Sequence, residues 1–109
     1  GFIQGLGWLT CEELYFSQEG KLLTTGPSTY KLPGSRDVPP IFNVKLLENA
    51  DNDEKTIFRS KAVGEPPLLL AISHFLALKE AIKASLPSSK AELLNSPATP
   101  SEILKAIYA

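Results

Sequence analysis

The chain contains no methionine, one cysteine and one histidine among its 109 residues. Cys11 alone cannot form an internal disulfide, which agrees with a reducing compartment such as the cytoplasm. One histidine and one cysteine are too few for a zinc-binding set, so we expect no metal held by protein side chains. Because the chain also begins inside an apolar helical pattern, the lack of methionine predicts a fragment of a longer protein.

An excess of charge of one sign is also absent. The chain carries 11 basic and 12 acidic residues, well mixed, for a net charge of −1. Such a balance offers no electrostatic footprint for nucleic acid or for an anionic membrane. No basic-then-apolar leader is present, and the longest apolar run, residues 66–72, is far shorter than a membrane span. We therefore expect a cytoplasmic protein with no nucleic-acid or membrane partner.

Apolar residues at steps of three and four predict a first helix over residues 2–15. Gly5 and Gly7 lie inside it, and each costs a helix roughly 1 kcal/mol relative to alanine. We interpret them as packing contacts; the alternative is that they let another backbone or a cofactor come close. After this helix, residues 17–20 predict a hairpin turn with positive φ at Gly20, and residues 26–40 predict a long loop.

Two segments in the middle of the chain predict β-strands. Residues 41–47 are rich in β-forming side chains and alternate, and residues 56–60 are the expected partner strand. The acidic residues 49–54 between them predict a solvated turn, because they lack the glycine and the final glutamate of a calcium loop. The expected fold class is therefore α+β, with helices packed on a small antiparallel sheet.

The last third of the chain predicts two helices. Residues 66–85 are almost uniformly apolar, which is typical of a buried helix, and Pro66 and Pro67 are tolerated in its first turn. Thr99 and Glu102 predict a capping box ahead of a short terminal helix. The side chains expected to be buried on the longer helix are Leu68, Leu69, Leu70, Ile72, Phe75, Leu76, Leu78 and Ile82. If no further chain covers that helix, we expect the isolated fragment to self-associate.

Two motifs carry a specific resemblance. They are Gly-Pro-Ser-Thr-Tyr-Lys at residues 26–31 and Ser-Lys-Ala-Val-Gly-Glu-Pro-Pro-Leu at residues 60–68. Together with residues 1–10, 12–14 and 96–100, they resemble, in this order, the C-terminal end of the molybdenum-binding subunit of xanthine dehydrogenases. The resemblance implies that residues 1–109 form a single C-terminal fragment of the molybdopterin-binding domain.

The resemblance also implies one catalytic residue. In the family, the glutamate that matches Glu65 is the base that removes a proton from a metal-bound hydroxyl, and Gly64 would bring the backbone near the cofactor. The sequence pattern alone favours a simpler role, in which a glutamate in the first turn interacts with the helix dipole. A catalytic carboxylate has to be ionised and yet partly dehydrated, since desolvation raises its pKa towards a useful range.

The parent protein implied by this resemblance oxidises hypoxanthine and xanthine to urate with water as the oxygen donor. Its cofactors would be molybdenum–molybdopterin, held mostly by residues outside this chain, and FAD and 2Fe-2S in a partner domain or subunit. Two alternatives stay open: a related oxidoreductase of aldehydes or N-heterocycles, and a non-catalytic interaction module. We expect the isolated fragment to be inactive.

Other polar or aromatic residues favour structural roles. His74 lies within the apolar run and has no nucleophile at a recognisable spacing, so a packing role is favoured. Gln4 and Trp8 could suggest cofactor contacts, but we interpret both as structural. Arg59 and Lys61 lack a glycine-rich loop beside them, so they predict solvated charges rather than a phosphate site.

Overall fold

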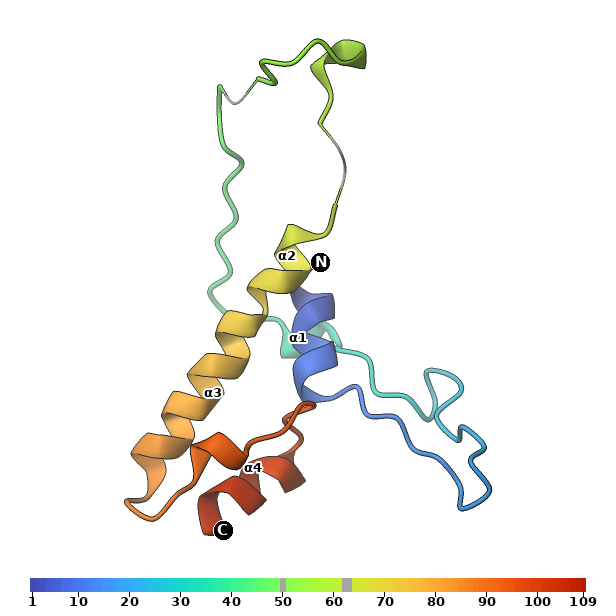
Figure 1. Ribbon diagram of the computed structural model, residues 1–109, viewed down its shortest axis with the longest axis vertical. Coiled ribbons are helices and arrows are strands. Elements are labelled where there is room, and N and C mark those ends of the chain that lie inside the picture. The colour runs from blue at the N-terminus through green and yellow to red at the C-terminus, as the bar shows by residue number, and fades with distance from the viewer. Residues whose placement is uncertain (50, 62–63) are drawn as a thin grey trace.

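The computed structural model describes residues 1–49, 51–61 and 64–109. Its helices are α1 (Phe2–Thr10), η1 (Ser35–Asp37), η2 (Ile57–Arg59), α2 (Pro66–Leu70), α3 (Ile72–Ser85), η3 (Ala91–Leu93) and α4 (Pro100–Tyr108), of which η1, η2 and η3 are 3₁₀ helices. Figure 1 shows α2 and α3 as one long rod, with α1 beside its upper end and α4 below. Residues 47–49 and η2 lie at the top of the view, away from these helices.

Helix α1 is central, and it is shorter than predicted. Gly5, Leu6 and Gly7 are its buried residues. The helix ends at Thr10 because the N–H groups of Cys11 and Glu12 both donate to the Gly7 carbonyl, at 3.0 and 2.9 Å, and turn the chain. The prediction of helix as far as residue 15 was therefore wrong by five residues.

A buried carboxylate ties the loop of residues 26–40 to α1. Glu12 is 8% exposed, and its carboxylate accepts a hydrogen bond of 2.6 Å from the Tyr30 hydroxyl. This hydrogen bond raises the pKa of Tyr30, because a phenolate beside a carboxylate is unfavourable. Gly7 makes room for the pair, since a Cβ atom there would collide with Glu12 Oε1 and with the ring of Pro33.

The predicted hairpin turn is confirmed, as a very small element. Phe16 and Leu22 form an antiparallel bridge. Two backbone hydrogen bonds of 2.8 Å flank it, from Ser17 N–H to the Lys21 carbonyl and from Leu23 N–H to the Tyr15 carbonyl. Gly20 has φ = 80°, the positive value that the turn requires.

The predicted α+β fold is wrong, because no β-strand forms within residues 1–49, 51–61 and 64–109. Residues 41–47 run without regular structure, and their β-forming side chains are exposed, 80% for Ile41 and 88% for Leu46. The expected partner forms η2 instead, with Phe58 and Arg59 at positive φ. A strand needs a neighbour for its N–H and C=O groups, and side-chain alternation cannot supply one.

The helix predicted over residues 66–85 is confirmed at both ends, with a break at Ala71 between α2 and α3. Its predicted burial is wrong. Of the eight side chains expected inside, only Ile82 is buried. Leu69 and Leu70 remain 64% and 63% exposed, because open hollows separate Leu69 from α1 and Leu70 from residues 42–46, and no other described segment covers them.

The main apolar core lies at the lower end of the rod, where α3, η3 and α4 meet. Its buried residues are Ile82, Ala91, Leu94, Ala98 and Ala106. The predicted terminal helix is confirmed: Pro100 is the first residue of α4, and Thr99 Oγ1 accepts from the Glu102 N–H at 3.4 Å. Of the predicted capping box only this half forms, because the Glu102 carboxylate binds Lys105 at 2.6 Å and the Thr99 N–H donates to the Pro97 carbonyl. A bond of 2.7 Å from Ala98 N–H to the Leu9 carbonyl connects this core to α1.

The molecule is more extended than a self-contained domain of its size. Its radius of gyration is 18.4 Å, whereas a compact chain of this length has one of about 13 Å. It exposes 8812 Å², against about 5,900 Å² for a compact monomer of the same mass. The difference exceeds the roughly 1,600 Å² that a standard protein interface buries. None of the helices in the described residues is long and apolar enough to cross a membrane.

Removing the α4 cap is expected to destabilise the lower core. The Thr99→Ala variant loses the oxygen that accepts from Glu102 N–H, so its free energy of unfolding should fall by about 1 kcal/mol. Thr99→Ser keeps that oxygen and should retain most of the stability. Urea denaturation followed by circular dichroism measures both variants, and equal midpoints for Thr99→Ala and the unmodified chain would contradict the assigned cap.

The 109-residue chain alone is expected to self-associate through the exposed apolar side chains of α2, which include Leu69 and Leu70. Exposure of a large apolar surface to water is unfavourable, and association would bury it. Sedimentation velocity over a wide concentration range should show a growing fraction of oligomer. Leu69→Glu with Leu70→Glu should reduce it, whereas Ser101→Glu on the exposed side of α4 should not. A monomer at every concentration would contradict the expected self-association.

Candidate functional site

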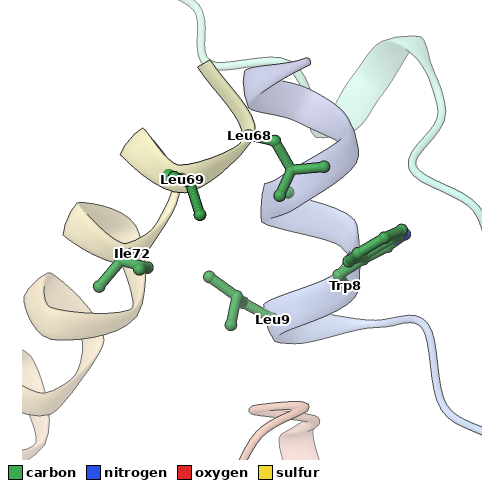
Figure 2. A pocket seen from close by; sticks show the side chains of 6 residues that line it. Trp8, Leu9, Leu68, Leu69 and Ile72 are labelled. Atoms are coloured by element: carbon green, nitrogen blue, oxygen red, sulfur yellow. The ribbon is translucent and has the colours of Figure 1, made fainter. Parts of the chain in front are cut away.

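The contact between α1 and α2 holds the residues around Glu65 in position. Gly5 lies against the Leu68 carbonyl and the fully buried Ala71. Figure 2 shows this region, where Leu68 and Leu69 of α2 face Trp8 and Leu9 of α1. Because backbone meets backbone here, the start of α2 has little freedom to move relative to α1.

Glu65 is the residue that precedes α2, and its carboxylate has no partner among the residues that the structure describes. Pro66 and Pro67 occupy the first two helical positions and have no N–H groups to offer. The next N–H group, that of Leu68, donates to the Glu65 backbone carbonyl at 3.0 Å. The side chain caps nothing and is exposed, and it forms no ion pair with the residues described. This carboxylate is therefore available to a group outside the chain.

Gly64, the residue before Glu65, has space around it. It is exposed, and a Cβ atom built on it would meet only Pro66 Cδ, at 3.7 Å. Nothing within the described residues requires a glycine here. The opening at residues 64 and 65 can accept a neighbouring group, whereas Gly5 and Gly7 are enclosed by protein atoms. Our interpretation of Gly5 and Gly7 as packing contacts is thus confirmed.

Two hollows lie near this end of the rod, and neither is lined by Glu65. The smaller one, about 170 Å³, lies between α1 and α2 and is lined by Gly5, Trp8, Leu9, Leu68, Leu69 and Ile72 (Figure 2). The larger one, about 580 Å³, lies between α2 and residues 42–46. Phe2 and Pro67 also line it, and the rings of Phe2 and Phe42 are 5.6 Å apart. Both hollows are largely apolar and bring together no pair of catalytic groups.

The structure does not bring the other candidate residues to Glu65. Trp8 lines the smaller hollow and is 50% exposed, while Gln4 is exposed on α1. His74 is half-buried on α3, and Arg59 lies in η2. No cluster of three or more potential metal ligands occurs among the residues that the structure describes. Cys11 donates a weak hydrogen bond to the Lys31 carbonyl, at 3.6 Å, and is otherwise unremarkable.

Sequence reasoning missed the structural role of Glu12 and Tyr30. Both lie in motifs that we used only to identify the resemblance. A signal was present, because Glu12 follows Leu9 by three residues and so continues the apolar face of the first helix. A carboxylate on such a face requires a donor, and the structure identifies that donor as Tyr30.

Comparisons with known proteins give one consistent answer. Residues 1–39 match the family model described as a molybdopterin cofactor-binding domain. The chain is 52% identical over 111 residues to the xanthine dehydrogenase/oxidase of Felis catus, an alignment that covers 96% of this chain and 8% of that protein. It is 46% identical over 119 residues to xanthine dehydrogenase 2 of Arabidopsis thaliana, covering 98% of this chain and 9% of that protein.

The Drosophila subobscura xanthine dehydrogenase is 52% identical over 84 residues, which cover 77% of this chain and 6% of that protein. The similarity thus extends across animal and plant relatives. By sequence, the chain belongs to the xanthine dehydrogenase family and spans less than a tenth of the length of these relatives.

Proposed function

We propose that residues 1–109 form a C-terminal part of the molybdopterin-binding domain of a longer oxidoreductase, and that Glu65 is its catalytic base. The observation that carries this proposal is the availability of the Glu65 carboxylate. It is exposed at the start of α2, and Pro66 and Pro67 withhold the N–H groups that would otherwise bind it. Sequence identity near 50% to xanthine dehydrogenases supports the same assignment.

The simpler role for Glu65, that of a helix cap, receives no support from the local hydrogen bonds. A capping carboxylate accepts from an N–H group in the first turn, and the Glu65 side chain accepts from none. The Glu65 carboxylate oxygens thus have no hydrogen-bond donor in the first turn of α2, which leaves them accessible for the proton uptake of a general base.

The partial dehydration that a base needs has to come from polypeptide outside residues 1–109. Glu65 and Gly64 are exposed in this chain, as is much of the apolar face of α2. Cover from a longer chain would remove water from both at once, as the site of a general base requires. We therefore propose that the remainder of the molybdenum-binding subunit is the principal partner, and that the 109-residue chain alone is inactive.

The residues around Glu65 are compatible with a cofactor bound nearby. Gly64 leaves the space open, and Glu65 keeps its oxygen atoms unpaired. When bound, molybdenum–molybdopterin would supply the oxidation of the substrate carbon. The role of this chain would then be to accept the proton at a Glu65 carboxylate oxygen. Helix α2 would hold that oxygen in a fixed position.

The same proposal includes the substrate, the route of the electrons and the cellular location. The substrate is a purine, hypoxanthine or xanthine, oxidised to urate with water as the oxygen donor. Electrons leave through FAD and 2Fe-2S centres in another domain or subunit. The Pro66-Pro67 pair after the acid favours the xanthine type over aldehyde-oxidising relatives, and a location in the cytoplasm agrees with the single cysteine.

The test is Glu65→Gln in the full-length protein that contains this segment. The amide keeps the shape of the side chain but cannot take up the proton, so turnover of xanthine should fall by about 100-fold or more. Molybdenum content, measured by mass spectrometry, should stay unchanged. Assays with a purine and with a panel of aldehydes decide the substrate class of the unmodified protein.

A matched control is Glu80→Gln, which neutralises an exposed glutamate of α3 that pairs with Lys83 at 2.6 Å. This variant should retain full turnover. If Glu65→Gln remains as active as Glu80→Gln, Glu65 is not the base. If the unmodified full-length protein binds molybdenum cofactor but oxidises neither purines nor aldehydes, the enzymatic assignment itself fails.

A further inference from the structure

Gly5 lies so close to the first turn of α2 that a residue with a side chain would not fit in its place. A Cβ atom built on Gly5 would collide with the Leu68 carbonyl oxygen, lie 2.8 Å from Ala71 Cβ and lie 3.1 Å from the Leu68 carbonyl carbon. Atoms at such separations have to move apart. Two of the three neighbours belong to the α2 backbone, so the movement would be that of the helix and not of a flexible side chain.

The contact leads directly to Glu65. Leu68 meets Gly5 through its carbonyl group, and its N–H group donates to the Glu65 carbonyl at 3.0 Å. Between them, Pro66 and Pro67 have φ fixed by their rings, so the turn is stiff. A displacement of Leu68 is therefore carried to Glu65 with little loss.

A second contact on the same face of α1 supports the turn. Gly1 precedes Gly5 by four residues, which places both on one side of the helix. A Cβ atom built on Gly1 would lie 3.2 Å from Pro67 Cβ. The start of α2 thus approaches α1 closely at two points: Pro67 lies against Gly1, and the Leu68 carbonyl lies against Gly5.

We propose that Gly5 is a positioning residue for Glu65. It touches no reacting atom; it sets how closely α2 approaches α1, and so it fixes where the Glu65 carboxylate lies. This inference rests on the proposed role of Glu65 as the base. Proton transfer depends steeply on distance, and a misplacement of about 1 Å lowers a rate by about 100-fold.

Gly7 provides the matched control, because it is equally enclosed but faces a different neighbour. A Cβ atom on Gly7 would collide with Glu12 Oε1 and Pro33 Cγ and would lie 2.7 Å from Pro33 Cδ. None of these atoms belongs to α2. Gly5→Ala and Gly7→Ala therefore add the same methyl group to the same helix, and both should lower the melting temperature. Only Gly5→Ala should displace α2.

The experiment compares Gly5→Ala, Gly7→Ala and Glu65→Gln in the full-length protein, with xanthine as substrate and molybdenum content measured in each. For Gly5→Ala we expect kcat to fall by about 100-fold, with KM changed little and the acidic limb of the pH–rate profile displaced. Gly7→Ala should keep the kcat and the profile of the unmodified enzyme. Equal losses of kcat in both glycine variants would overturn the inference and leave a purely structural role.

The two proposals fail in different ways. A Glu65→Gln enzyme with full turnover refutes the assigned base. An inactive Glu65→Gln enzyme together with an unaffected Gly5→Ala enzyme keeps the base and overturns the positioning role. If Gly5→Ala does not fold, Ala71→Gly gives the answer, since it removes the methyl group that packs on Gly5. A several-fold loss of kcat is then expected relative to the open-loop control Gly34→Ala, and unchanged kcat overturns the inference.

Discussion

The close approach of α1 and α2 at Gly5 is the constraint on which the candidate site depends. Helix propensity alone argues against glycine in α1, yet Gly5 is buried where the Leu68 carbonyl and Ala71 leave no room for a side chain. The loss in helix propensity is offset by backbone-to-backbone packing. Because that packing includes Leu68, it also determines the position of the residue that precedes α2, which is Glu65.

Local signals in the sequence predicted much of the helical structure. The boundaries near Pro66, Ser85 and Pro100 were predicted correctly, because proline at a helix start and the Thr99 cap act within one turn. The positive φ of Gly20 was predicted for the same reason. These features depend on neighbours a few residues away, so the sequence contains all the information that they require.

Features that depend on distant partners were not predictable in this way. Residues 41–47 have the composition of a strand, but composition does not provide the adjacent strand that a sheet needs, and Leu46 remains 88% exposed. The apolar pattern of residues 66–85 likewise indicated burial without indicating what would cover Leu69 and Leu70. The position of Glu65 at the start of a helix followed from the two prolines. Its lack of a hydrogen-bond partner and the support from Gly5 became evident only in three dimensions.

The exposed apolar rod and the unpaired Glu65 carboxylate have a common explanation, since cover from a longer polypeptide would bury the first and partly dehydrate the second. The most direct measurement is an experimental structure of the full-length protein with its cofactor bound. The account predicts that Gly5 still touches the Leu68 carbonyl and that the Glu65 carboxylate faces the cofactor, with no side chain of residues 1–109 bonded to it. A Glu65 that pairs with a lysine or arginine of this chain and points away from the cofactor would contradict it.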